Sequence, residues 1–223
     1  MYISPNKVLR QASIFSLLLL VGCSNAPTSE DLIRAKEKIE DKFNEMVNVS
    51  KDIPESIEGG YEDLGTLINE DYNWFQKKDI TKAKFGTIRK MEQKLNRCKS
   101  QFEYLNSLHR DASSNVDKYF KMLGKNLKLI NRKDLKINQK QRMDNVSVQL
   151  DTVLNGTKSV LYKLEAEISK YEEIVAFLRG DLALDMIGDH TISEMELISG
   201  SANSLILELQ DYIEEGNLLI SKM

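Results

Sequence analysis

The sequence has very few of the residues that most enzymes use for proton transfer and metal binding, with two histidines and two cysteines among 223 residues. Acid–base catalysis needs a group that titrates near the working pH, most often histidine. A di-metal bundle would need glutamate three residues before histidine, but Asn106 and Ile187 stand there before His109 and His190. The motifs HExxH and CxxC and a glycine-rich phosphate loop are also missing. We therefore predict no enzymatic activity, no catalytic residue, no metal site and no cofactor.

Proline, strand-like alternation and long apolar runs are also scarce. Three prolines, 29% charged residues and almost no alternating Val/Ile/Thr stretches are typical of long helices with solvated faces. The longest apolar run, residues 12–21, is shorter than the roughly 20 residues that cross a bilayer core, so we predict no transmembrane helix. A chain with a net charge of −3 is a poor candidate for binding nucleic acid, which requires a concentrated basic face. Nucleic acid is therefore not an expected partner.

The N-terminal residues have the three parts of a secretory signal. Lys7 and Arg10 provide positive charge without an acidic residue, and residues 12–21 (ASIFSLLLLV) form a short apolar segment. A small residue, Gly22, stands immediately before Cys23. This order of charge, apolar run, small residue and cysteine predicts an exported protein.

The run Leu20-Val21-Gly22-Cys23 resembles the lipobox of bacterial lipoprotein precursors at all four positions. That lipobox is an aliphatic residue, a small or aliphatic residue, Gly or Ala, and then Cys. The resemblance implies that residues 1–22 are a signal peptide, cleaved between Gly22 and Cys23. It also implies lipidation of Cys23, with a diacylglyceryl group on the sulfur and, in many species, an acylated amine. Two acyl chains hold a protein stably on a membrane, whereas one chain binds reversibly.

The same resemblance places the protein on the extracytoplasmic side of the bacterial cell membrane. Ser24 stands where the family usually has Asp when a lipoprotein stays in the inner membrane, which favours the outer membrane in a bacterium with two. Removing residues 1–22, which hold two bases and no acid, changes the length from 223 to 201 and the net charge from −3 to −5. Such a body is too acidic for peripheral binding to anionic lipid, so we expect the anchor to provide membrane binding.

Apolar residues at three- and four-residue spacing predict the helices that follow the anchor. The first helix is expected to start at Thr28 or Ser29 as its cap and to stop at Ile53-Pro54. Gly59-Gly60 then predicts a turn, and a weaker helical pattern covers residues 61–78.

Two longer patterns follow, over residues 88–130 and 135–178, with a predicted turn at 131–134. Gly156 is the expected weak point of the second one. A last helix is expected to start at Thr191-Ile192-Ser193-Glu194, which has the spacing of a capping box. The clearest seam consists of Ile88, Met91, Leu95, Cys98, Phe102, Leu105, His109, Ala112, Val116, Tyr119 and Leu123.

These patterns predict an all-α fold, an elongated antiparallel helical bundle with coiled-coil-like seams over residues 31–223. Residues 23–30 are the lipidated cysteine and a short linker. An extended coiled-coil dimer is the competing architecture, although the short polar breaks favour folding back within one chain. For Cys98 we favour a core position over a bridge between chains, because it falls on the clearest seam. His109 is expected as a buried seam histidine and His190 as a turn or cap residue.

A basic group marks the expected tip between the two long helices. Simple solvation is the favoured interpretation, and docking to peptidoglycan, lipopolysaccharide phosphate or an acidic protein is the alternative. The group consists of Lys121, Lys125, Lys128, Arg132, Lys133, Lys136, Lys140 and Arg142.

The first functional prediction is a membrane-anchored lipoprotein that acts as a non-catalytic scaffold or adaptor for a protein partner in the cell envelope. Self-association stays open. The alternative is a binding module for an envelope ligand such as cell-wall glycan. Its candidate aromatic residues are Tyr61, Tyr72, Trp74 and Phe75.

Overall fold

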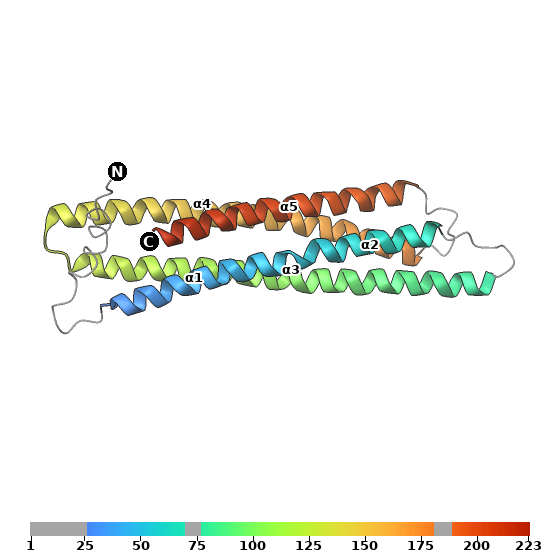
Figure 1. Cartoon of the computed structure of the whole chain (residues 1–223), viewed down its shortest axis with the longest axis horizontal. Coiled ribbons are helices and arrows are strands. Elements are labelled where there is room, and N and C mark those ends of the chain that lie inside the picture. The colour runs from blue at the N-terminus through green and yellow to red at the C-terminus, as the bar shows by residue number, and fades with distance from the viewer. Residues whose placement is uncertain (1–25, 70–76, 181–188) are drawn as a thin grey trace, which may run out of the picture.

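Five helices form an elongated antiparallel bundle in the computed structural model, which describes residues 26–69, 77–180 and 189–223 (Figure 1). The helices are α1 (Ser29–Ser50), α2 (Asp52–Asn69), α3 (Lys77–Lys128), α4 (Lys133–Gly180) and α5 (Asp189–Ser221). At 1.5 Å per residue, the 52 residues of α3 extend over about 78 Å. The described residues contain no strand. The prediction of an all-α antiparallel bundle is therefore confirmed.

Helices α1 and α2 follow one another along α3 and together take the place of one helix in a four-helix arrangement (Figure 1). α3 also contacts α4, α4 contacts α5, and α5 closes the ring against α1 and α2. One apolar core runs through all five helices. The predicted seam of α3 forms its wall within a single chain, since every predicted seam residue from Ile88 to Tyr119 is buried and Leu123 is partly buried.

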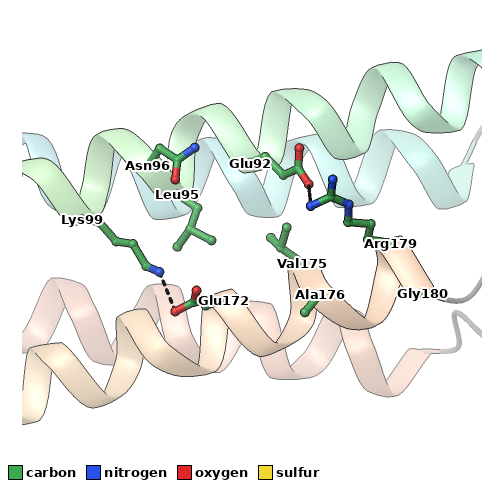
Figure 2. A pocket seen from close by; sticks show the side chains of 9 residues that line it. All are labelled: Glu92, Leu95, Asn96, Lys99, Glu172, Val175, Ala176, Arg179 and Gly180. Carbon is green, nitrogen blue, oxygen red and sulfur yellow. Dashed lines mark ion pairs between the residues drawn. The ribbon is translucent and has the colours of Figure 1, made fainter.

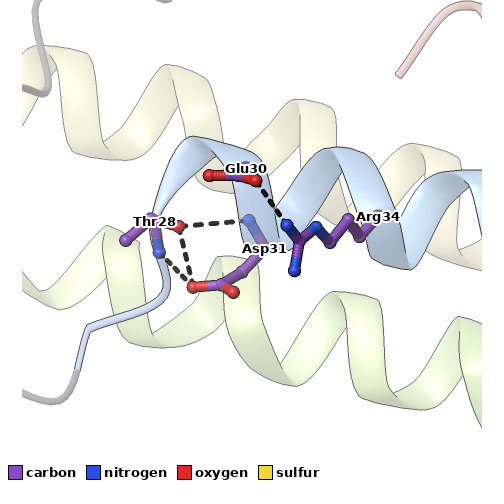
Figure 3. Close-up of polar contacts among 4 residues, drawn as sticks. All are labelled: Thr28, Glu30, Asp31 and Arg34. Atoms are coloured by element: carbon purple, nitrogen blue, oxygen red, sulfur yellow. Dashed lines mark hydrogen bonds and ion pairs between the residues drawn. The ribbon is translucent and has the colours of Figure 1, made fainter.

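Helix α1 begins with the capping residue that the sequence indicates. The backbone N–H of Asp31 donates to Oγ1 of Thr28 at 3.1 Å, and the backbone N–H of Thr28 donates to Oδ2 of Asp31 at 2.9 Å (Figure 3). This reciprocal pair is a capping box and satisfies two otherwise unpaired donors. The first residues of α1, Ser29 and Glu30, lie in the segment that was predicted as linker.

The predicted turn at Gly59-Gly60 is wrong, because both residues lie inside the continuous helix α2. The reason for glycine is a close approach: a Cβ on Gly60 would overlap the hydroxyl group of Tyr171. That hydroxyl donates to the carbonyl of Met91 at 3.0 Å and is buried. The predicted stop before Pro54 is confirmed, since α1 ends at Ser50 and Pro54 falls in the first turn of α2. There its missing N–H removes no helical hydrogen bond.

Helix α5 begins two residues before the predicted capping box, so that prediction is also wrong. Thr191 lies inside the helix and is 8% exposed, which makes it a packed residue and not a cap. The connection between α3 and α4 covers residues 129–132, so Lys133 and Asp134 of the predicted turn already belong to α4.

Gly156 is a packing site and not a weak point in α4. A Cβ at this position would overlap the ring of Tyr212 from α5. The missing side chain thus leaves room for the Tyr212 ring, and the helix continues through Gly156 without interruption.

Candidate functional site

The start of α1 lies at the same end of the bundle as the connection between α3 and α4 (Figure 1). The side-chain amide of Asn126 donates to the carbonyl oxygen of Pro27 at 3.2 Å. Asn126 stands two residues before the end of α3 at Lys128. The chain that leads into α1 is thereby held against the last turn of α3. We call this end of the molecule the anchor end, after the lipid anchor that the sequence predicts at Cys23.

The basic group predicted from the sequence lies at the anchor end, where α3 ends and α4 begins (Figure 1). We call residues 121–142 the basic tip. All eight of its basic residues are exposed. Two of them pair locally: Arg132 lies 2.6 Å from Asp134, and Lys140 lies 3.6 Å from Asp144. The other six have no ion pair within the described part of the chain, so their charge is available to an outside partner.

Apolar side chains stand among these basic residues. Leu129 is 50% exposed and Ile137 is 57% exposed, and Leu135 is exposed as well. Single exposed apolar residues are ordinary on a protein surface. Here three of them lie within nine residues of a cationic segment, so the tip combines positive charge with accessible apolar groups.

The histidine on the α3 seam has a structural position. His109 is 8% exposed, and its Nε2 lies 2.9 Å from the carbonyl oxygen of Leu154 across the bundle. Burial lowers the pKa of His109, and the nearby ammonium of Lys158 lowers it further. The ring is therefore neutral at physiological pH and acts as a donor to the helix opposite. The prediction of a buried seam histidine is confirmed.

Cys98 is a core residue, as the sequence favours. It is free and fully buried, and burial raises the pKa of its thiol to about 12. Thiol chemistry requires the thiolate and access to it. A bridge between chains would therefore require the core to open.

His190 is exposed in the first turn of α5, and its Nε2 lies 3.6 Å from Glu194 Oε1 one turn later. It therefore lies inside the helix and does not precede it. Within the described ranges, no group of three or more His, Cys, Asp or Glu residues is placed to hold a metal ion.

A shallow groove of about 470 Å³ runs between α3 and α4 toward the end of the bundle opposite the tip (Figure 2). Its charged residues pair across it: Lys99 lies 2.5 Å from Glu172, and Arg179 lies 3.3 Å from Glu92. Each of these charged residues has an oppositely charged partner within the groove, which leaves no unpaired charge for a ligand. The two ion pairs therefore link α3 to α4.

Several predicted site residues lie outside the described residues. They are Leu20, Val21, Gly22 and Cys23 of the lipobox, and Tyr72, Trp74 and Phe75 of the aromatic group. Tyr61 of that group is partly buried against the core. Among the helices that the structure describes, none has the length and apolar character to span a bilayer.

No family model, curated protein or solved structure matches the chain. Its possible functions therefore have to be argued from its own residues. Two features of the anchor end were missed by sequence reasoning: the contact of Pro27 with Asn126, and the exposure of Leu129 and Ile137. The run of Lys and Arg was the only local signal there.

Proposed function

We propose that the chain is a bacterial envelope lipoprotein, anchored through Cys23, whose bundle is a non-catalytic scaffold or adaptor. The observation that carries the proposal is the position of the lipobox relative to the bundle. Cys23 is four residues before Pro27, and Pro27 contacts the end of a helix about 78 Å long. A bundle attached by its end can extend far from the membrane and can reach a partner there.

The character of the body supports a scaffold. The apolar core continues along the bundle, and its polar contacts link helices to one another. Lys94 joins α3 to α2 through Asp63 at 2.6 Å, and Gln101 donates to Asp52 of α2 at 3.0 Å. His109 packs in the core, and His190 lies on the surface. These features favour a scaffold, a protein that acts through its shape and its surface.

The anchor is tested by expressing the full chain and its Cys23→Ala variant in bacteria. The mass of the purified wild-type protein should show loss of residues 1–22 and gain of a diacylglyceryl group, and the protein should fractionate with membranes. The variant should keep its signal peptide and gain no lipid. A wild-type chain without acyl groups contradicts the proposal.

The adaptor function is tested by cross-linking the protein in intact cells and identifying what purifies with it, with Cys23→Ala as control. One defined protein partner that is lost in the control supports a membrane-tethered adaptor. If no protein partner is found, the alternative of cell-wall glycan binding takes its place. Quenching of the single Trp, Trp74, by soluble peptidoglycan fragments would then support that alternative.

A further inference from the structure

We propose that the basic tip is a second membrane-contact surface, which docks on the anionic lipid headgroups of the membrane that holds the Cys23 anchor. The inference rests on the proposed anchoring, and it corrects the expectation that the lipid alone provides membrane binding. Its basis is that positive charge, exposed apolar groups and the start of α1 all lie at one end of the bundle.

Charge is the first argument. The basic tip holds eight basic residues and one acidic residue, Asp134, which is a net charge of +7 within residues 121–142. The cleaved chain, residues 23–223, carries −5, so its remainder carries −12, the difference between −5 and +7. The positive charge of the chain is therefore concentrated in this segment. Its anionic part would be repelled by an anionic bilayer, whereas the tip would be attracted.

Distance is the second argument. Pro27 is four positions after Cys23, which limits the reach of this segment to about 14 Å. Pro27 contacts Asn126, which lies about 3 Å along the axis from the end of α3. The Debye length at physiological ionic strength is about 8 Å. An acyl group on Cys23 therefore holds the start of α1 at most about two Debye lengths from the membrane surface, and any conformation of this segment shorter than full extension places the tip nearer to it.

Chemical fit is the third argument, and it favours lipid over the other anionic envelope polymers. Leu129 and Ile137 are exposed between the bases, and apolar groups of this kind enter the boundary between headgroups and acyl chains. Peptidoglycan and an acidic protein also carry negative charge. Neither of them has a boundary between headgroups and acyl chains at a fixed distance from the anchor. The anchor also gives lipid headgroups a high effective concentration at the tip, which no free ligand has.

The tip is tested with the full chain, purified from bacterial membranes and reconstituted into vesicles. One set of vesicles is pure phosphatidylcholine, and the other contains 30% phosphatidylglycerol. A polarity-sensitive maleimide fluorophore is attached at Asn138→Cys in the tip or at Glu196→Cys near the opposite end, both of which replace exposed residues. The buried Cys98 should not react. The tip label should report an apolar environment only with phosphatidylglycerol, and the distant label should report water in both.

Charge variants separate lipid docking from simple proximity. Lys133→Glu with Lys136→Glu places negative charge in the first turn of α4, which the helix tolerates well. It should lower the ratio of docked to undocked tip by about 30-fold or more, given two lost attractions. The matched control is Lys90→Glu with Arg110→Glu, the same charge change on exposed residues about 27 Å or more from the end of α3. The control should leave the tip signal unchanged.

The outcomes distinguish this inference from the proposed anchoring. A protein that is acylated and vesicle-bound, but whose tip label reports water in both vesicle types, overturns the inference and leaves the anchor intact. A tip label that responds to peptidoglycan sacculi and not to phosphatidylglycerol overturns the lipid assignment. A chain without acyl groups overturns the anchor. The tip label, with vesicles added to that chain, would still show whether the tip binds anionic lipid by itself.

Discussion

At the scale of single residues, the packing around glycine gives the clearest prediction. Gly156→Ala should destabilise the protein by about 1–3 kcal/mol, because its Cβ overlaps the ring of Tyr212 and overpacked cores are strained. Gly200→Ala is the matched control in α5, where a Cβ would meet nothing within 4 Å. The control should stabilise by about 0.5–1 kcal/mol through helix propensity. Urea unfolding measures both, and stabilisation by both variants would contradict a tight contact between Gly156 and the Tyr212 ring.

A second residue-scale prediction concerns pH. The pKa of His109 is lowered by burial from its ordinary value near 6.5, so the unfolded chain binds more protons than the folded chain just below pH 6.5. The free energy of unfolding should therefore fall as the pH drops below about 6.5 and continue falling until the lowered pKa is passed. Urea unfolding between pH 7.5 and 5.5 measures this slope.

The variant His109→Gln should reduce that slope, because glutamine can donate to Leu154 and does not titrate. The control is His190→Gln, since His190 is exposed at the surface of α5. An equal slope in the wild type and in His109→Gln would show that other groups cause the pH dependence.

At the scale of helices, the start of α1 depends on one capping box. Thr28→Ala removes the acceptor for the Asp31 N–H, and the loss of such a cap lowers helix stability by roughly 1 kcal/mol. Amide hydrogen exchange in the first turn of α1 should accelerate about fivefold, while exchange in α4 stays unchanged. Ser29→Ala is the neighbouring control and should have little effect. Uniform acceleration throughout the bundle would contradict a local role for the cap.

Most of the helical layout could be predicted because burial in a bundle follows local spacing. Apolar residues three and four apart must share one face, and the residues predicted for the α3 seam are buried or partly buried. The errors come from contacts distant in the sequence. The sequence predicts a turn at Gly60 because nothing near it indicates Tyr171, and it predicts a cap at Thr191 although packing buries that residue.

The candidate surface at the anchor end was predictable only in part, for the same reason. The density of Lys and Arg in residues 121–142 is visible in the sequence, and the turn between the two long helices gives it a place at a tip. Its proximity to the start of α1 depends on Pro27 and Asn126, which are 99 residues apart. Local patterns carry no information about such a pair. The proximity of the tip to the start of α1 therefore required the fold.

At the scale of the whole molecule, a distance measured along the bundle distinguishes an extended body from a collapsed one. The same measurement also distinguishes a monomer from a dimer. Asn138 is 42 residues from the end of α4, and Glu196 is seven residues from the start of α5. With α5 returning along α4, spin labels at these positions should be about 50 Å apart, at 1.5 Å per residue. A compact domain of the same size has a radius of gyration of only about 17 Å.

Double electron–electron resonance on the Asn138→Cys/Glu196→Cys variant in detergent measures this distance. Because the apolar seams are buried within one chain, we expect one distance distribution that is unchanged when labelled protein is diluted with unlabelled protein. An extended coiled-coil dimer would expose these seams to a partner and would add distances between chains that disappear on dilution. A main distance well below about 40 Å would contradict the extended bundle, and with it the reach on which the proposed adaptor function depends.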